Sequence, residues 1–137
     1  MMWQVPGAGI DPARFNPLRP VKVLYDFDGP RTFTFRDQEG ELCLAHWCDE
    51  AEGTTRYLAV AFSNRLLAQL EQGVLSVRAA LEQPRAWVID EDATGNVRAA
   101  WRVELTDLPE DILPKPGVLL LPALERAHSA DVTSKSA

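Results

Sequence analysis

Four side chains of kinds that bind metals lie in one short stretch, at Cys43, His46, Cys48 and Asp49. A structural zinc site needs four ligands that converge on one point. The stretch ELCLAHW alternates as a β-strand does, so Cys43 should face away from His46 and Cys48. At most two ligands then converge, and we predict neither a metal site nor a cofactor.

The same histidine is the candidate base for a nucleophilic cysteine in the body of the chain. His46 and Cys48 are separated by one residue, and an extended backbone holds such side chains roughly 7 Å apart. A nucleophile needs its base within hydrogen-bond reach. The spacing therefore predicts no activated cysteine.

The sharpest local motif is VKVLYDFDGP, an apolar stretch that ends in Asp26, Asp28 and Gly29. It resembles the first motif of the haloacid dehalogenase phosphohydrolases. The resemblance implies that Asp26 attacks phosphorus and that Asp28 acts as general acid and base, with magnesium bridging both to the phosphate. A magnesium-dependent phosphohydrolase that uses Asp26 and Asp28 is therefore one hypothesis.

The residues after this motif favour a different interpretation. In those enzymes the motif ends a parallel strand and leads into a loop and a helix. Here Gly29 and Pro30 are followed at once by RTFTF, whose alternation is typical of the second strand of a hairpin. Asp26 and Asp28 then flank a turn, where aspartate side chains accept hydrogen bonds from the backbone.

The elements that would position these residues follow from the hydrophobic period. Period-two alternation predicts a meander of four strands, and Ser63 and Ser76 are good N-caps for two short helices before a further hairpin. The predicted fold is α+β with an antiparallel sheet in the order ββββααββ. The expected ranges are strands 21–27, 31–35, 41–47 and 56–62, helices 64–72 and 77–83, and strands 85–90 and 97–105.

Composition sets the expected organisation. The 137 residues suit one domain, which we expect over 21–122, after an irregular arm over 1–20 that is rich in proline and glycine. Small and polar residues predict a flexible tail over 123–137. The net charge of -6 and the scattered arginines argue against nucleic acid, and from the sequence we expect neither a leader peptide nor a membrane span. We expect a cytoplasmic protein.

Partner-binding candidates are side chains of the types that dominate protein interfaces. Three tryptophans fall in predicted strands, and an acidic turn follows the third strand. Core packing competes for the same aromatic residues. The candidates are Trp47, Asp49, Glu50, Trp101 and Arg102.

The runs LYDFDGPRTFTF, LCLAHWCDE and RYLAVAFSNRLLAQLEQGVLSVRAAL together resemble small bacterial domains of uncharacterised function, over about residues 21–88. The resemblance implies order and a bacterial context, and it implies no catalytic residue. We therefore predict an acidic protein-interaction or regulatory accessory domain, antitoxin-like in type and without catalytic activity of its own. Its expected partner is another protein, a second copy of the chain included.

Overall fold

The computed structural model describes residues 2–120, and residue 1 and residues 121–137 lie outside that range. The expected tail over 123–137 falls in this outside part. Within the described residues, no helix combines the length and the apolar character needed to cross a membrane.

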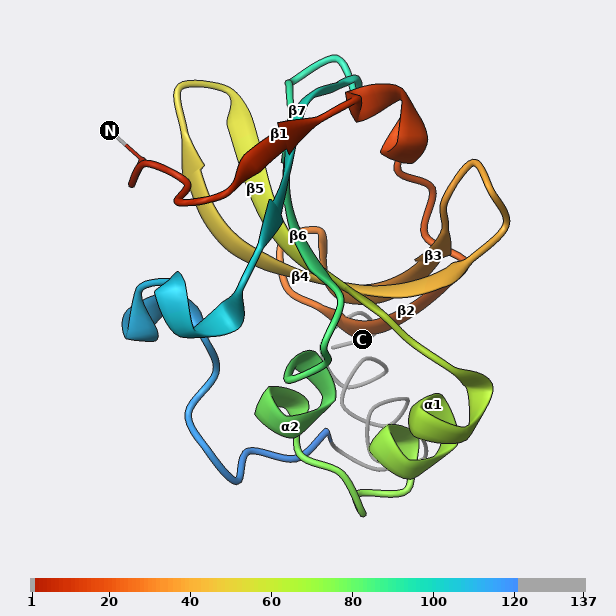
Figure 1. The fold of residues 1–137 in the computed structure, drawn as a ribbon. Coiled ribbons are helices and arrows are strands. Elements are labelled where there is room, and N and C mark those ends of the chain that lie inside the picture. Colours follow the sequence, from red (N-terminus) through yellow and green to blue (C-terminus); the bar gives the residue numbers. More distant parts are fainter. Residues whose placement is uncertain (1, 121–137) are drawn as a thin grey trace, which may run out of the picture.

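The described chain forms one antiparallel sheet of seven strands in the order β1-β7-β6-β5-β4-β3-β2, with two short helices between β5 and β6 (Figure 1). The expected α+β class, the meander and the late hairpin are confirmed. The strands are β1 (Ala8–Ile10), β2 (Lys22–Asp26), β3 (Pro30–Arg36), β4 (Leu42–Ala51), β5 (Thr54–Ala61), β6 (Ala86–Glu91) and β7 (Val97–Val103). The helices are α1 (Asn64–Glu71) and α2 (Val77–Leu81), with 3-10 turns η1 (Pro12–Phe15), η2 (Leu105–Asp107) and η3 (Glu110–Ile112).

The expected order ββββααββ is wrong at its start, because β1 lies inside the segment expected to be irregular. Its sequence, Ala-Gly-Ile, has little intrinsic strand preference, and it is extended because it pairs with β7. Gly7 fits this approach closely, since a Cβ atom there would lie 2.1 Å from the carbonyl oxygen of Arg102. A pairing partner 90 residues away is not visible in the local sequence.

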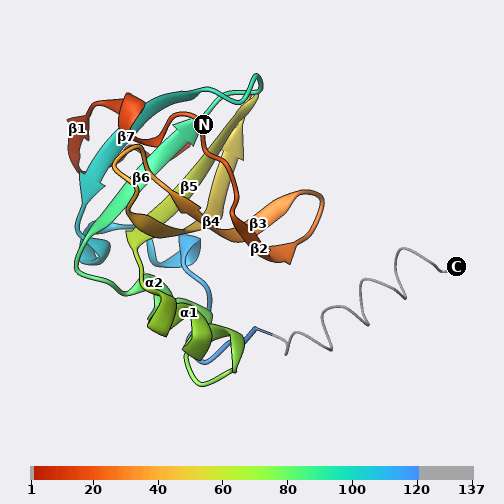
Figure 2. The same ribbon diagram turned by 90° about the vertical axis from the view of Figure 1, so that its right-hand side faces the viewer.

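Serine caps start both helices, as the sequence predicts. The Ser63 side chain accepts a hydrogen bond from the backbone N–H of Leu66, and Ser76 accepts one from Ala79. Each satisfies one of the donors that a helix leaves unpaired at its N-terminus. Figures 1 and 2 show α1 and α2 together on the convex side of the curved sheet.

Both faces of the sheet are covered. The convex face packs aliphatic side chains of the strands, such as Leu44, Leu58 and Val60, against Leu70 of α1 and Leu81 of α2. The concave face holds an aromatic cluster that includes the rings of Phe33, Phe35, Tyr57 and Trp87. Neighbouring residues along β4, β5 and β6 alternate between the two clusters, and these three strands are therefore nearly continuous apolar runs.

Phe15 of η1 closes the concave face. Its ring centroid lies 6.1 Å from that of Phe35 on β3 and 5.4 Å from that of Trp87 on β6, and only 1% of the residue is exposed. The residues on either side of it bond to the β3–β4 turn and to β7, since Gln38 N–H donates to the backbone oxygen of Arg14 and Val97 N–H donates to the side-chain Oδ1 of Asn16. The arm is therefore a structural part of the sheet's interior (Figure 1).

One expected face is wrong at its first residue. Alternation over 97–105 predicts one shared face for Val97, Ala99, Trp101, Val103 and Leu105. In the structure Val97 packs in the concave cluster, whereas Trp101 and Val103 pack on the convex side. A register shift between Asp90 and Glu91 of the partner strand changes the alternation, because Asp90 pairs with Ala99 and Glu91 with Val97. An irregularity of this kind inverts the side chains beyond it.

Candidate functional site

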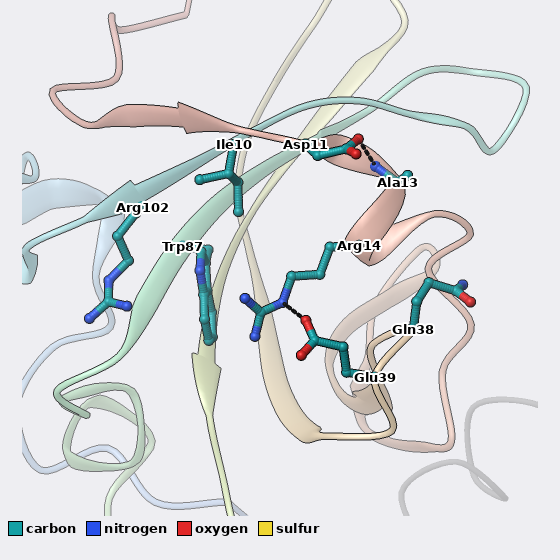
Figure 3. Close-up of a pocket in the computed structure, with 8 residues that line it drawn as sticks. All are labelled: Ile10, Asp11, Ala13, Arg14, Gln38, Glu39, Trp87 and Arg102. Atoms are coloured by element: carbon teal, nitrogen blue, oxygen red, sulfur yellow. Dashed lines mark hydrogen bonds and ion pairs between the residues drawn. The ribbon is translucent and has the colours of Figure 1, made fainter.

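A pocket of about 680 Å³ opens at one end of the curled sheet, and we call it the mouth pocket (Figure 3). Its walls come from segments far apart in sequence: the end of β1, η1, the β3–β4 turn, β6 and β7. Mouths of curved sheets and barrels are common places for small ligands. Its lining residues are Ile10, Asp11, Ala13, Arg14, Gln38, Glu39, Trp87 and Arg102.

Three arginines gather around the buried indole of Trp87. The guanidinium carbons of Arg14, Arg85 and Arg102 lie 4.9, 5.3 and 5.7 Å from its ring centroid. Figure 3 shows Arg14 and Arg102 on opposite sides of the ring. The electron-rich faces of indole attract such cations, which explains how three positive charges can share one position.

Carboxylates neutralise two of these arginines. Arg14 Nε donates to Asp37 Oδ2 at 3.1 Å, and its Nη2 donates to Glu41 Oε1 at 3.2 Å. Arg85 donates from both Nη atoms to the same Glu41 carboxylate. Asp37 is itself fixed, because its Oδ1 accepts the backbone N–H groups of Glu39 and Glu41.

Arg102 differs from its two neighbours. Within the described part of the chain it has no carboxylate partner, and its one hydrogen bond runs from Nη2 to Pro84 O at 3.2 Å. Its Nε is buried without a hydrogen-bond partner. A guanidinium carries five N–H donors, so most of the hydrogen-bonding capacity of Arg102 is unused.

A second candidate site lies along the edge strand β2, and we call it the β2 apolar surface. It gathers six of the large apolar side chains that the described chain leaves exposed, with exposed fractions from 42% to 65%. The surface consists of Val21, Val23, Tyr25, Phe27, Val118 and Leu119. It extends around the edge of the sheet, because Val23 pairs with Phe33 of the concave cluster, whereas Tyr25 pairs with Thr32 and lines a pocket with Leu119 on the convex side.

A smaller pocket of about 360 Å³ joins the two halves of this surface. Tyr25 from β2 and Val118 and Leu119 from the C-terminal segment line it together. Thr32 and His46 also line this pocket, and a hydrogen bond of 2.9 Å joins Thr32 Oγ1 and His46 Nδ1. Burial lowers the pKa of His46 to about 4, so the imidazole is neutral at neutral pH.

A stacked arginine lies at the tip of the β2–β3 hairpin, next to this surface. The guanidinium carbon of Arg31 lies 3.6 Å from the ring centroid of Trp47 and 5.8 Å from that of Phe27. Its Nε donates to Phe27 O at 2.7 Å, and no carboxylate within the described residues pairs with it. A half-buried, oriented cation beside exposed aromatic rings is a typical arrangement at protein interfaces.

Asp26 and Asp28 lie where the hairpin interpretation puts them. Asp26 ends β2, Asp28 lies in the turn with φ of 57°, and the chain enters β3 at Pro30. Both side chains are exposed, and residues 2–120 contain no group of three or more His, Cys, Asp or Glu residues placed to hold a metal. The described residues therefore supply no third acidic group for magnesium chemistry.

The metal-ligand stretch is divided between the two faces of the sheet, as alternation predicts. Cys43 packs in the concave cluster, whereas Cys48 packs against the convex cluster and His46 faces the small pocket. Burial raises the pKa of each thiol to about 12, and in Cys43 the nearby Asp37 and Glu41 add to this shift. Both cysteines are free thiols held in the protonated, unreactive form.

The five partner-binding candidates do not form one surface. Trp101 packs against the convex cluster, whereas Trp47 packs against the concave cluster and Arg102 lines the mouth pocket. Asp49 and Glu50 lie near the far end of the β4–β5 hairpin. Of the five, Trp47 lies beside the β2 apolar surface through its contact with Arg31, and Arg102 belongs to the other site.

The side chains of the β2 apolar surface were not among the sequence candidates. Apolar side chains at alternate positions, such as Val23, Tyr25 and Phe27, are typical of a strand that buries one face, so the local pattern does not mark them as exposed. The signal that identifies them is position, because β2 is an edge strand that pairs with β3 alone within residues 2–120. Sequence alone does not rank the strands of a sheet from edge to centre.

A comparison with known proteins gives one match. The model of a family of unknown function, DUF6575, matches residues 15–133, and the chain therefore belongs to this family. No curated protein and no solved structure matches the chain. The matched range includes β2 to β7 and the whole β2 apolar surface. It begins at Phe15 and so leaves out β1 and the mouth-pocket residues Ile10, Asp11, Ala13 and Arg14.

Proposed function

We propose that this member of the DUF6575 family is a protein-interaction domain that binds another protein through its β2 apolar surface and has no catalytic activity of its own. The observation that carries the proposal is the concentration of exposed Val21, Val23, Tyr25, Phe27, Val118 and Leu119 along one edge of the sheet. Keeping these side chains in water costs free energy that a partner would recover.

The chemistry of the surface specifies the partner. Its centre is apolar and aromatic, and its margin carries Arg31, a stacked cation without a carboxylate among the described residues. A complementary partner presents apolar side chains with an Asp or Glu opposite Arg31. Fixed arginines stacked on tryptophan suit this pairing, since little side-chain entropy is lost on binding.

The irregular geometry of β2 favours side-chain recognition over the addition of a strand. Register shifts interrupt the β2–β3 ladder on both sides of Tyr25. Such irregularities twist an edge and hinder regular pairing with a further strand. We therefore expect a partner that inserts side chains into the pocket between Tyr25 and Leu119.

Capture with matched variants tests the proposal. The full chain, a Tyr25→Ser/Phe27→Ser variant and a control Gln4→Ser/Ala93→Ser variant are each used to capture proteins from the source cells. Gln4 and Ala93 are exposed and lie outside the β2 apolar surface. The expected result is a protein retained by wild type and control and lost from the first variant, with binding at least tenfold weaker when the purified pair is measured.

The oligomeric state is measured in parallel by light scattering. A dimer that the Tyr25→Ser/Phe27→Ser change converts to a monomer would identify the partner as a second copy and would support the proposal. The proposal would be contradicted if the wild-type protein is a monomer and the Tyr25→Ser/Phe27→Ser variant still captures every protein that the wild type captures.

No observation in residues 2–120 favours the phosphohydrolase alternative at Asp26 and Asp28. Two results together would nevertheless establish that activity. The protein would release phosphate from an aryl phosphate when magnesium is present, and the Asp26→Asn variant would not. The assay is run on the same protein preparation used for capture.

A further inference from the structure

The mouth pocket and the β2 apolar surface have no residue in common. Two buried side-chain nitrogens in the described residues lack hydrogen-bond partners, Trp3 Nε1 and Arg102 Nε, and only Arg102 lines a pocket. Because Arg102 Nε is buried, a ligand in the pocket would meet the Nη groups of this guanidinium, and the hydrogen bond they make within the described chain runs from Nη2 to Pro84 O. Arg102 therefore lines the pocket with a guanidinium that no carboxylate of the described residues binds.

The fold supplies carboxylates to the other arginines nearby. Asp37 and Glu41 bind Arg14, and Glu41 also binds Arg85. On the convex face Asp90 binds Arg56 through two hydrogen bonds of 2.7 and 2.8 Å. These pairs use the geometric match between a planar guanidinium and a carboxylate. Arg102 carries the same group, is half-buried and lines the mouth pocket on the opposite side of Trp87 from Arg14 (Figure 3).

We propose that the mouth pocket binds a small monocarboxylate with an apolar body, and that Arg102 holds its carboxylate. The remaining walls support the apolar part of this description, since Ile10, Ala13 and Trp87 line the cavity. The volume of about 680 Å³ lies within the range of small-molecule sites.

The charges of the lining decide between a carboxylate and a phosphate. Asp11 and Glu39 share the cavity with Arg14 and Arg102, so the two lining cations are balanced by two lining anions. For a dianionic phosphate the attraction to the arginines and the repulsion by the carboxylates both double, so the balanced lining gives it no net electrostatic gain. Removing a dianion from water costs more than removing a monoanion, so the pocket favours a singly charged ligand.

Nuclear magnetic resonance titration of the full chain with phenylacetate tests the proposal. Phenylacetate carries the carboxylate and an apolar ring, 2-phenylethanol is its uncharged counterpart, and inorganic phosphate is the dianionic arm. The expected result is saturable shifts of the Trp87 indole and Arg102 Nε resonances with phenylacetate, and binding at least tenfold weaker for the other two probes.

Two variants and a control assign the effect to the pocket. Arg102→Gln should weaken phenylacetate binding at least tenfold, whereas Arg65→Gln, which removes the same charge from the exposed surface of α1, should leave it unchanged. Ala13→Glu adds a third carboxylate at an exposed lining position and should weaken binding at least threefold. If Arg102→Gln fails to fold, the Ala13→Glu variant decides.

The outcomes that overturn the proposal are specific. They are an absence of saturable phenylacetate binding, equal binding of phosphate or 2-phenylethanol, or unchanged binding in a folded Arg102→Gln or Ala13→Glu protein. None of these results bears on the β2 apolar surface, because no residue lines both sites.

Discussion

Two arginine–tryptophan clusters lie on opposite faces of the same sheet and differ in how their charge is balanced. On the convex face Arg56 lies 4.7 Å from the ring of Trp3 and 5.5 Å from that of Trp101, and Asp90 binds it through two hydrogen bonds. In the mouth pocket Arg102 lies 5.7 Å from the ring of Trp87 and has no carboxylate partner in the described chain.

The difference shows which cluster the fold needs. Arg56 and Asp90 are both buried, at 5% and 8% exposure, and neither charge would be tolerated without the other. Arg102 is half-buried at an open pocket, where solvent or a ligand can satisfy it. The convex cluster is thus a structural pair, whereas the mouth cluster holds a charge available for binding.

The largest effect is expected for Phe15, which holds the wall of the mouth pocket in place. Phe15→Ala removes a ring that touches Phe35 and Trp87 and should lower the free energy of unfolding by about 4 kcal/mol. Urea unfolding followed by circular dichroism measures it. Phe27→Ala, at a residue 63% exposed, is the matched control and should cost less than about 1 kcal/mol. Equal losses would mean that the arm does not close the concave face.

The next effect concerns the buried pair of the convex cluster. Asp90→Asn leaves the Arg56 charge buried without its counter-ion and should lower the free energy of unfolding by about 3 kcal/mol. Arg98→Gln breaks an exposed pair with Asp92 and should change it by less than about 1 kcal/mol. A small loss in Asp90→Asn would remove the contrast between the two clusters.

The pH dependence of stability provides a third test, at the convex side of the sheet. The folded pKa of His46 is lowered to about 4 from 6.5, so the unfolded chain binds the proton more tightly than the folded one. The contribution of the neutral His46 side chain to the free energy of unfolding is fully present above pH 6.5 and is lost as the pH falls toward 4. By pH 5 the free energy of unfolding should be lower by about 2 kcal/mol. Unfolding of wild type and His46→Gln at pH 7.5 and 5 measures it. Parallel losses in the two proteins would contradict the assignment to His46.

The smallest effect is expected for the arginine of the mouth cluster. Arg102→Gln removes an unneutralised charge and one cation–π contact, so the free energy of unfolding should change by less than about 1 kcal/mol. Thermal unfolding beside Asp90→Asn measures the contrast directly. A loss as large as that of Asp90→Asn would make Arg102 a structural residue and would end the distinction between the clusters.

Local sequence predicted the elements well where their own residues decide them. The caps at Ser63 and Ser76, the alternation of Phe33 and Phe35 with the threonines, and the opposite faces of Cys43 and His46 all follow from neighbours in the chain. The hairpin after Asp28 follows in the same way. Each of these features depends on contacts within a few residues.

The candidate sites could not be predicted in this way, because each joins segments far apart in sequence. Arg102 was a candidate as part of an interface, but its pocket exists only because β1 pairs with β7 and η1 packs across the curled sheet. Tyr25 and Leu119 meet at one pocket although 94 positions separate them. The register shifts between β2 and β3 and between β6 and β7 also have no clear marker in the sequence. The shift between β6 and β7 places Val97 on the concave face.

The sequence by itself determined an acidic α+β domain whose strands follow one another as antiparallel neighbours, and it determined that Asp26 and Asp28 flank a hairpin turn. Only the tertiary structure decided which strand is the exposed edge, that the arm fills the concave face, and which arginine is left without a carboxylate. The physical reason is that alternation and capping act between neighbours, whereas exposure and charge balance depend on every segment that packs nearby.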